Sequence, residues 1–205
     1  MVKKMLKEFA ETEIAPISAY IDENAEYPYE TVAKLGELGV MGMPFPQEYG
    51  GAGTDYLTYI MAVEEISKVD ASHGVIVQTH NALCCWPIYA YGTEEQKQKY
   101  LAPLTTGEKL GAFGLTEPMA GSDASGTRTT AVRDGNDYVI NGSKIFITNG
   151  YYADTYVITA QMDKNRGTRG IAAFILEKGT PGFTFGKKEK KMGIRSSPTM
   201  ELVFE

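Results

Sequence analysis

Hydrophobic residues recur three or four positions apart through the first half of the chain, which is the spacing of amphipathic helices. Residues 3–24 form the first such segment, and its apolar stripe consists of Leu6, Phe9, Ala10, Ile14, Ile17 and Ile21. Residues 28–38 repeat the spacing until Gly39 ends it. The sequence PFPQEYGGAG, residues 44–53, is predicted to be a loop, because its prolines and glycines cannot continue a helix.

Three further helices are predicted before residue 105. The first begins at the capping residue Asp55 and runs to about Val69. Its spacing predicts Leu57, Ile60, Met61 and Ile66 on the buried side and Glu64, Glu65 and Lys68 outside. The second covers residues 72–91. The third starts at the capping box Thr93-Glu94-Glu95-Gln96 and ends near Leu104.

After Gly107 the hydrophobic pattern changes to a period of two, with β-branched and aromatic residues between turn pairs. Strands are predicted at residues 127–132, 138–140, 143–148, 156–160, 171–176 and 200–204, with a further one around Phe183 and Phe185. Asp134-Gly135 and Asn141-Gly142 are typical of two-residue hairpin turns, which need positive φ. We therefore expect an α+β fold, in which an N-terminal all-α helical bundle (1–108) precedes an antiparallel β-barrel or sandwich (109–205).

Composition excludes several classes of function. The formal net charge of −6 argues against a nucleic-acid-binding protein, which would need a basic surface. We found no apolar run near the roughly 20 residues of a membrane span and no secretory signal, so a cytoplasmic chain is expected. The adjacent Cys84 and Cys85 are interpreted as buried thiols. No metal site is expected, because His73 and His80 lack the usual ligand spacing and an acidic partner.

The segment Phe113 to Asp123, FGLTEPMAGSD, is a candidate ligand cradle. It joins an apolar run to a Thr-Glu-Pro stop and a turn of small residues. Gly121 would let a ligand approach the backbone, and Ser122 adds a hydroxyl beside it, an arrangement that suits a phosphate. The alternative is an ordinary strand that ends at Pro118 in a polar turn, and the residues alone leave both interpretations open.

The segment Asn141 to Gly150, NGSKIFITNG, suggests a surface for a flat ring. Regular alternation would place Phe146 and Thr148 on one face of a strand and Ile145 and Ile147 on the other, in the core. An aromatic wall beside a hydroxyl donor suits a planar heterocycle. An ordinary cross-strand Phe-Thr pair is the alternative.

Together with MGIRSS at residues 192–197, these two motifs resemble the acyl-CoA dehydrogenase family over the whole chain, and most closely its short-chain, butyryl-CoA type members. The resemblance implies FAD-dependent α,β-dehydrogenation of an acyl-CoA thioester, with electrons passed to an electron-transferring flavoprotein. It also implies a homotetramer for the full-length protein. Contact with FAD is implied for Phe113, Gly114, Leu115, Thr116, Glu117, Pro118, Gly121, Ser122, Phe146, Ile147 and Thr148. Ser122 would also contact the thioester, Thr116 the pyrimidine side of the flavin, and Thr148 its N5 atom.

The resemblance leaves the catalytic base unassigned. Full-length members continue into a C-terminal helical domain that carries the catalytic glutamate, whereas this chain stops at Glu205 in an expected strand. We therefore expect that domain to be absent and the 205-residue chain to be inactive alone; Glu117 matches a structural position of the family. The alternatives are an acyl-CoA oxidase or flavin monooxygenase relative, or a non-catalytic flavin-binding or structural fragment. The basic cluster Lys187, Lys188, Lys190 and Lys191 is expected to be a solvated loop, with coenzyme A phosphate binding as the lesser alternative.

Overall fold

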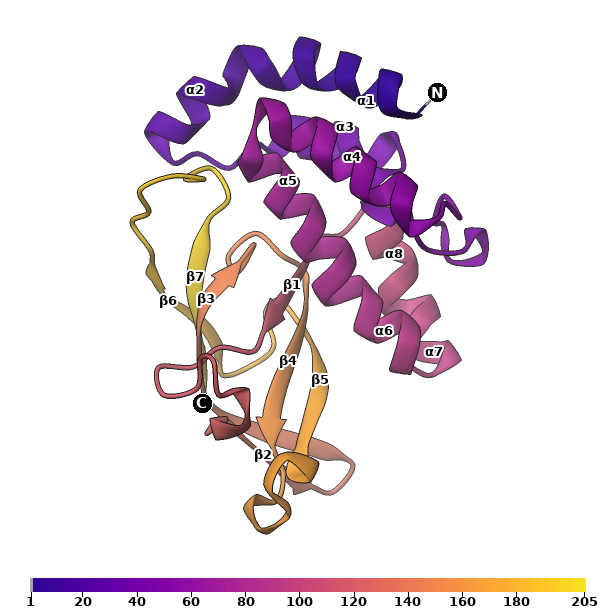
Figure 1. The fold of residues 1–205 in the computed structure, drawn as a ribbon. Helices are drawn as coiled ribbons and strands as arrows, with labels where there is room; N and C mark the ends of the chain where they lie inside the picture. Colours follow the sequence, from indigo (N-terminus) through magenta and orange to yellow (C-terminus); the bar gives the residue numbers. More distant parts are fainter. Residues whose placement is uncertain (1) are drawn as a thin grey trace.

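The computed structural model describes residues 2–205 and begins with a long, nearly continuous helix. This helix consists of α1 (Val2–Phe9), a π-helical segment η1 (Ala10–Ile14) and α2 (Ala15–Asn24), and it crosses the top of the molecule in Figure 1. Its inward face is fully buried at Leu6, Ala10 and Ile14. The predicted helix at residues 3–24 is therefore confirmed.

Most of the remaining helices of the N-terminal half also follow the predicted segments; the exceptions are two short 3₁₀ turns after Gly39, one of which, Gln47–Tyr49, lies inside the loop predicted at residues 44–53. The helices after α2 are α3 (Tyr29–Glu37), η2 (Val40–Gly42), η3 (Gln47–Tyr49), α4 (Tyr56–Val69), α5 (Ala71–Gln78), η4 (Thr79–Cys85), α6 (Trp86–Tyr91), α7 (Glu94–Gln96), η5 (Lys97–Leu101) and α8 (Ala102–Thr105). Both predicted caps are present. The Asp55 carboxylate accepts from the Thr58 amide at 2.7 Å, and Thr93 and Gln96 form the reciprocal capping box.

Each π-helical segment lies just before a proline. The segments η1, η4 and η5 end two residues before Pro16, Pro87 and Pro103, respectively. Proline has no N–H to donate, and its ring would clash with the carbonyl four residues earlier. The helix therefore widens locally and continues instead of ending.

The predicted burial of α4 is partly wrong. Leu57 and Ile60 are 71% and 55% exposed, whereas Glu65, expected outside, is only 5% exposed. The helix has apolar residues around most of its circumference, so spacing alone permits more than one buried face. Tyr59, Ala62 and Ile66 form the face that packs inward. The buried Glu65 carboxylate is then paired with Lys68 at 2.7 Å and Lys3 at 3.5 Å.

The β-half forms a seven-stranded mixed sheet, not the predicted antiparallel one. Its strands are β1 (Gly111–Gly114), β2 (Thr130–Asp134), β3 (Asp137–Thr148), β4 (Thr155–Gln161), β5 (Ile171–Glu177), β6 (Phe183–Lys188) and β7 (Thr199–Phe204). The order is β1-β4-β2-β3-β7-β6, with β5 paired to β4. Strand β4 is parallel to β1 and β2, and the other pairs are antiparallel. The α+β class is confirmed, but the sheet differs because β1 enters from the helices and pairs with a distant strand.

The predicted hairpin turn at Asn141-Gly142 is also wrong, because β3 runs straight through these residues. The turn between β2 and β3 is made by Gly135, at φ 60°, and Asn136. Gly142 meets a different requirement: a Cβ there would lie 2.6 Å from Thr129 Oγ1. The glycine allows the strand to pass against the entry to β2.

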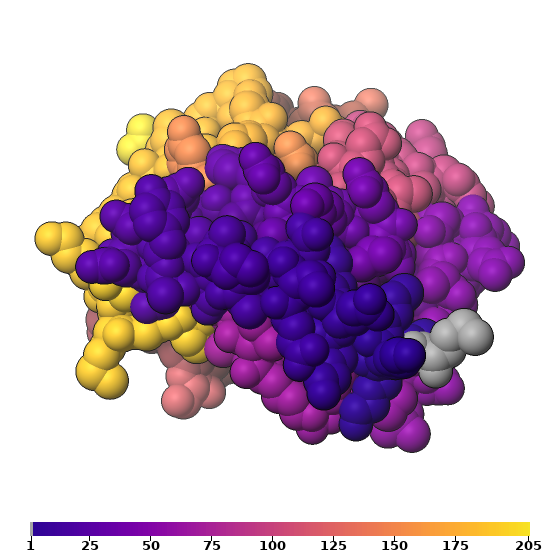
Figure 2. Space-filling model, turned by 90° about the horizontal axis from the view of Figure 1, so that it is seen from above, coloured from indigo at the N-terminus to yellow at the C-terminus, as the bar shows by residue number. Residues whose placement is uncertain are grey.

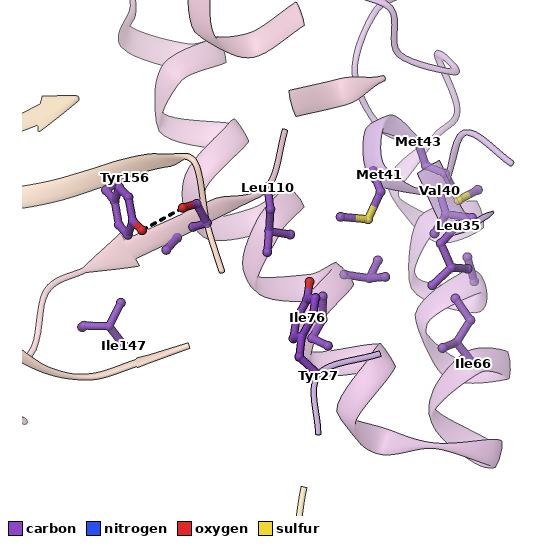
Figure 3. Packing of buried hydrophobic residues seen from close by; sticks show 14 of the residues in the cluster. Tyr27, Leu35, Val40, Met41, Met43, Ile66, Ile76, Leu110, Ile147 and Tyr156 are labelled. Carbon is purple, nitrogen blue, oxygen red and sulfur yellow. Dashed lines mark hydrogen bonds between the residues drawn. The ribbon is translucent and has the colours of Figure 1, made fainter. Parts of the chain in front are cut away.

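Two hydrophobic clusters join the helical half to the sheet. The larger of them contains Leu35 and Ile66 from the helices together with Leu110, Ile147 and Tyr156 from the β-half, all of which are shown in Figure 3. Figure 2 shows the N-terminal helices lying across one face of the molecule, with C-terminal residues beside them. The strands that carry the two motifs therefore pack against the helical half through a shared core.

Candidate functional site

The structure brings the two sequence motifs together where β1 ends. After Gly114 the chain leaves the sheet and runs beside β3, and the Ile145 amide donates to the Thr116 carbonyl at 2.8 Å. Glu117 and Ala120 then exchange two backbone hydrogen bonds of 3.0 and 3.1 Å, which close a tight turn. The candidate ligand-binding segments are thus held side by side by backbone contacts.

A buried ion pair lies beneath this junction. Lys144 Nζ is 2.7 Å from Glu117 Oε1, and the two side chains are 0% and 4% exposed. The same carboxylate accepts from the amides of Arg128 at 2.6 Å and Thr129 at 3.1 Å. Although burial by itself raises the pKa of Glu117, the hydrogen bonds from Lys144, Arg128 and Thr129 outweigh it and hold the pKa below its usual range. Glu117 is therefore an ionised structural carboxylate whose acceptors are already occupied.

Lys144 was not among the site residues predicted from the sequence. Its ammonium also donates to the Leu115 carbonyl at 3.0 Å and to Thr159 Oγ1 at 3.1 Å, so all three of its donors have protein acceptors. A signal was available: a lysine stands inside a strand, two positions before the candidate Phe146. Lysine is rarely fully buried unless it is paired, so a buried lysine implies a carboxylate partner.

Phe146 sits in a β-bulge of strand β3. The pairing with β7 changes register between Lys144 and Ile147, so regular alternation does not hold through this part of the strand. Lys144 and Ile147 are both buried although they are three residues apart. Phe146 has φ 60° and is 58% exposed. A bulky residue at positive φ is strained, and such strain concentrates at functional sites.

The turn that follows Glu117 carries the exposed part of the first motif. A Cβ built on Gly121 meets nothing within 4 Å in the described part of the chain, so no contact there requires a glycine. Ser122 is exposed beside it. The Asp123 carboxylate, in contrast, caps the short helix η6 (Ala124–Gly126) by accepting from the Ser125 amide at 3.1 Å. Gly121 and Ser122 can therefore face a ligand, whereas Asp123 has a local role.

The residues implied to contact FAD differ in their exposure to solvent. Gly114, Glu117 and Ile147 are buried, whereas Pro118, Gly121, Ser122 and Phe146 are exposed; the partly buried members are Phe113, Leu115, Thr116 and Thr148. A cavity of about 360 Å³ adjoins Glu117 and Pro118. Phe146 and Thr148 do not line this cavity.

His73 has a structural partner at each ring nitrogen. His73 Nδ1 hydrogen-bonds Asp70, and its Nε2 lies 2.7 Å from Thr31 Oγ1; both contacts are buried. The expectation that His73 lacks an acidic partner was wrong, because Asp70 also caps α5 and so lies next to it. Within residues 2–205, no group of three His, Cys, Asp or Glu side chains is arranged to hold a metal ion.

Cys84 and Cys85 are buried free thiols, as predicted. Burial raises the pKa of Cys84 to about 12 and that of Cys85 well above its ordinary value, so both remain protonated. Across residues 2–205, we find no helix that combines the length and apolar character needed to span a membrane.

The basic cluster occupies the end of β6 and the start of the loop to β7, and this loop lies near the end of α2 (Figure 1). Lys188 Nζ donates to the Ala25 carbonyl at 3.0 Å, and the Arg195 amide donates to Asp22 Oδ1 at 2.8 Å. Lys191 Nζ donates to the Ser197 carbonyl at 2.5 Å. The loop is therefore partly used to join the sheet to the first helix, which a purely solvated loop would not do.

Comparison with known proteins gave close matches over the whole chain. The short-chain specific acyl-CoA dehydrogenase of Clostridium acetobutylicum is 60% identical over 205 residues, which are 100% of this chain and 54% of that protein. Among solved structures, butyryl-CoA dehydrogenase from Megasphaera elsdenii superposes with a TM-score of 0.96 at 51% identity, over 100% of this chain and 54% of that one. A chain in the structure described as the electron transferring flavoprotein of Acidaminococcus fermentans has a TM-score of 0.98 at 56% identity, with coverage of 100% and 54%.

A more distant structure contains the implied cofactor. An acyl-CoA dehydrogenase from Bacillus anthracis, complexed with FAD, matches with a TM-score of 0.92 at 38% identity, over 100% of this chain and 35% of that one. The chain spans about half the length of the curated relatives it matches. The family model for the acyl-CoA dehydrogenase N-terminal domain matches residues 1–108, and that for the middle domain matches residues 112–205. The chain therefore belongs to the acyl-CoA dehydrogenase family.

Proposed function

We propose that this chain provides the N-terminal and middle parts of an FAD-dependent dehydrogenase for short-chain acyl-CoA thioesters such as butyryl-CoA. The observation that carries the proposal is the junction between Thr116 and Ile145, which places the first motif beside the bulge that exposes Phe146. The relatives named above support the choice of substrate class, and the FAD complex of a family member supports the cofactor.

The residues at the junction suit a flavin. The exposed Phe146 offers an aromatic wall, and the hydroxyls of Thr116 and Thr148 are donors on the two neighbouring segments. The open space at Gly121 allows a ligand to approach the backbone, and Ser122 would meet the thioester. Phe113 to Ser122 and Phe146 to Thr148 would thus hold FAD, which supplies the two-electron acceptor for the substrate.

The base that removes the α-proton is, in this proposal, provided by residues beyond Glu205. Glu117 is unsuited to that role because Lys144 and two backbone amides already occupy its carboxylate. We further propose two domains, residues 1–108 and 109–205, a tetrameric full-length enzyme, and an electron-transferring flavoprotein as the electron acceptor. The match to the Acidaminococcus fermentans structure supports that partner.

Titration with FAD tests the cofactor proposal. We expect the purified chain to bind FAD, with quenching of flavin fluorescence and a shift of its visible absorbance. Loss of the Phe146 ring in Phe146→Ala should weaken binding about fivefold, since stacking of this kind contributes about 1 kcal/mol. Tyr20→Ala is the matched control, because Tyr20 is similarly exposed, at 61% against 58%, but lies on α2. Equal losses in both variants, or no binding by the wild-type chain, would contradict the proposal.

Turnover tests the placement of the base. With butyryl-CoA and an artificial electron acceptor, the 205-residue chain should show no dehydrogenation above the rate without protein. Sustained turnover at ordinary enzyme rates would show that a base lies within these residues. Replacement of Glu117 by Gln would then decide whether this carboxylate is that base.

A further inference from the structure

We infer that Lys144 is the positioning residue of the flavin-binding segment, acting through the Glu117 carboxylate and the Leu115 carbonyl. The inference rests on the proposed function and goes beyond it, because Lys144 itself touches no ligand: its side chain is 0% exposed. Its role is to hold residues 115–117 in one position relative to β3.

The contacts of Lys144 join chain segments that are far apart in the sequence. Its Nζ donates to the Leu115 carbonyl at 3.0 Å, to Glu117 Oε1 at 2.7 Å and to Thr159 Oγ1 on β4 at 3.1 Å. The next residue, Ile145, binds the Thr116 carbonyl. Three consecutive residues of the first motif are thus held by two consecutive residues of the second.

The Glu117 carboxylate extends this network to the entry of β2. Its two oxygens accept from the amides of Arg128 and Thr129, which precede that strand. Glu117 also closes the turn with Ala120 through its backbone. Contacts from β3 and from the entry to β2 therefore together fix the position of the turn that carries Gly121.

Gly114 has a specific place in this arrangement. A Cβ there would lie 3.3 Å from Lys144 Cγ and 2.9 Å from Ile158 Cγ2. The glycine therefore makes room for the Ile158 side chain on β4 and for the lysine stem beside it. Packing against Ile158 and Lys144 therefore explains the glycine without any contact between Gly114 and a cofactor, and Ile158 makes the closer approach.

Stability alone does not account for a charge pair at this depth. Removing two charges from water costs free energy that their attraction recovers only in good geometry, and apolar residues of similar shape commonly serve as well. A fully satisfied pair differs from apolar packing in being directional, because its hydrogen bonds are met in one arrangement. We therefore assign the pair to geometry: it fixes the Leu115 carbonyl and the Glu117 side chain on either side of Thr116, so that the Thr116 hydroxyl meets the flavin.

The test compares a neutral double variant, Lys144→Met with Glu117→Gln, with the wild-type chain. Both replacements keep the side-chain length, so folding should be retained. We expect FAD affinity to fall at least tenfold and amide hydrogen exchange in residues 114–122 to become at least tenfold faster. The urea midpoint of global unfolding should fall modestly, because the Leu115 carbonyl loses its side-chain donor and one of the two carboxylate acceptors becomes an N–H donor. Amide exchange outside residues 114–122 should change only by this global amount. The matched control is Lys178→Met, which removes another lysine that donates to a backbone carbonyl, that of Tyr151 at 2.6 Å, outside the site.

A second variant separates positioning from general packing. Thr159→Val removes only the β4 acceptor and leaves both contacts of Lys144 to the first motif, so FAD affinity should stay within about threefold of wild type. An equal loss in Thr159→Val and in the double variant would overturn the inference. So would a folded double variant with wild-type affinity and exchange. If the double variant does not fold, Glu117→Gln alone is expected to show the local increase in exchange, and wild-type exchange would overturn the inference.

The exchange measurement needs no flavin, so it distinguishes two kinds of failure. If the wild-type chain does not bind FAD but the double variant still loosens residues 114–122, the proposed function fails and the positioning role of Lys144 stands. If the wild-type chain binds FAD and the variant binds it equally well, the proposed function stands and the positioning role fails.

Discussion

Acidification from pH 7 to pH 5 is expected to destabilise the protein through His80, which connects the helices to the start of β1. Its Nε2 lies 3.1 Å from the Met41 carbonyl and 3.0 Å from that of Leu104, and its Nδ1 accepts from the Gly111 amide at 2.9 Å. This pattern needs a neutral ring, with the proton on Nε2. Protonation of Nδ1 would remove the acceptor for Gly111 at the start of β1.

The magnitude follows from the pKa of His80. Complete burial lowers that pKa from 6.5 to about 4, while the contacts to the Leu104 and Met41 carbonyls act in the opposite direction. Between pH 6.5 and about pH 4, His80 binds a proton more strongly in the unfolded chain than in the folded one. The contribution of His80 is therefore complete above the ordinary pKa and is lost as the pH falls toward the native one. The shift corresponds to about 3 kcal/mol in total, of which about 2 kcal/mol should be lost between pH 7 and pH 5.

Urea unfolding followed by circular dichroism at pH 7, 6 and 5 measures this loss, and His80→Gln provides the comparison. Glutamine keeps a donor near the Nε2 position but does not titrate, so the stability of the variant should depend less on pH by about 2 kcal/mol over this range. Parallel pH profiles for wild type and variant would refute the reasoning. If His80→Gln does not fold, an NMR titration of the wild-type histidine rings replaces it. Protonation of the folded His80 ring above pH 5.5 would then be the contradicting result.

Three other outcomes follow from local geometry. Asp55→Ala removes the cap of α4 and should lower the free energy of unfolding by about 1 kcal/mol in urea titrations; an unchanged midpoint would contradict this. Gly121→Ala should leave the melting temperature unchanged but weaken FAD binding, whereas Gly51→Ala should destabilise the fold, because its Cβ would lie 2.2 Å from a backbone oxygen; the reverse ranking in thermal melts would count against both assignments. Cys84 and Cys85 should react with a thiol reagent only after denaturant is added, and rapid labelling of the native protein would contradict their burial.

The helical half could be predicted because its signals are local. Apolar spacing located the helices, and the caps at Asp55 and Thr93 fixed where two of them begin. The prolines that follow the π-helical segments were also visible in the sequence, although they were not interpreted. The inward face of α4 could not be chosen, because Leu57 and Ile66 are equally apolar and only packing against the neighbouring helices selects between them.

The sheet could be predicted only in part, because strand pairing is not local. The alternating pattern located most of the strands, but β1 pairs in parallel with β4 more than forty residues later, which no nearby turn signals. Asn141-Gly142 has the composition of a hairpin turn and yet lies inside a strand, since Gly142 is required by the approach of Thr129 from another segment. The Asn-Gly pair was recognised in the sequence but interpreted as a hairpin turn, whereas the structure requires the glycine because Thr129 packs against it.

Prediction of the candidate site was also limited by contacts between distant residues, although local departures from ordinary strand sequence mark its position. Both motifs were found in the sequence, but the contact that joins them needed coordinates, because Lys144 and Glu117 are 27 positions apart. Within three residues β3 contains a buried charge, a register shift and Phe146 at positive φ. Each feature is unfavourable for an ordinary strand, and natural sequences depart from local rules mainly where function requires it. Their coincidence beside the Thr116 carbonyl is therefore independent physical support for a binding site at this junction, and it does not depend on the likeness to any relative.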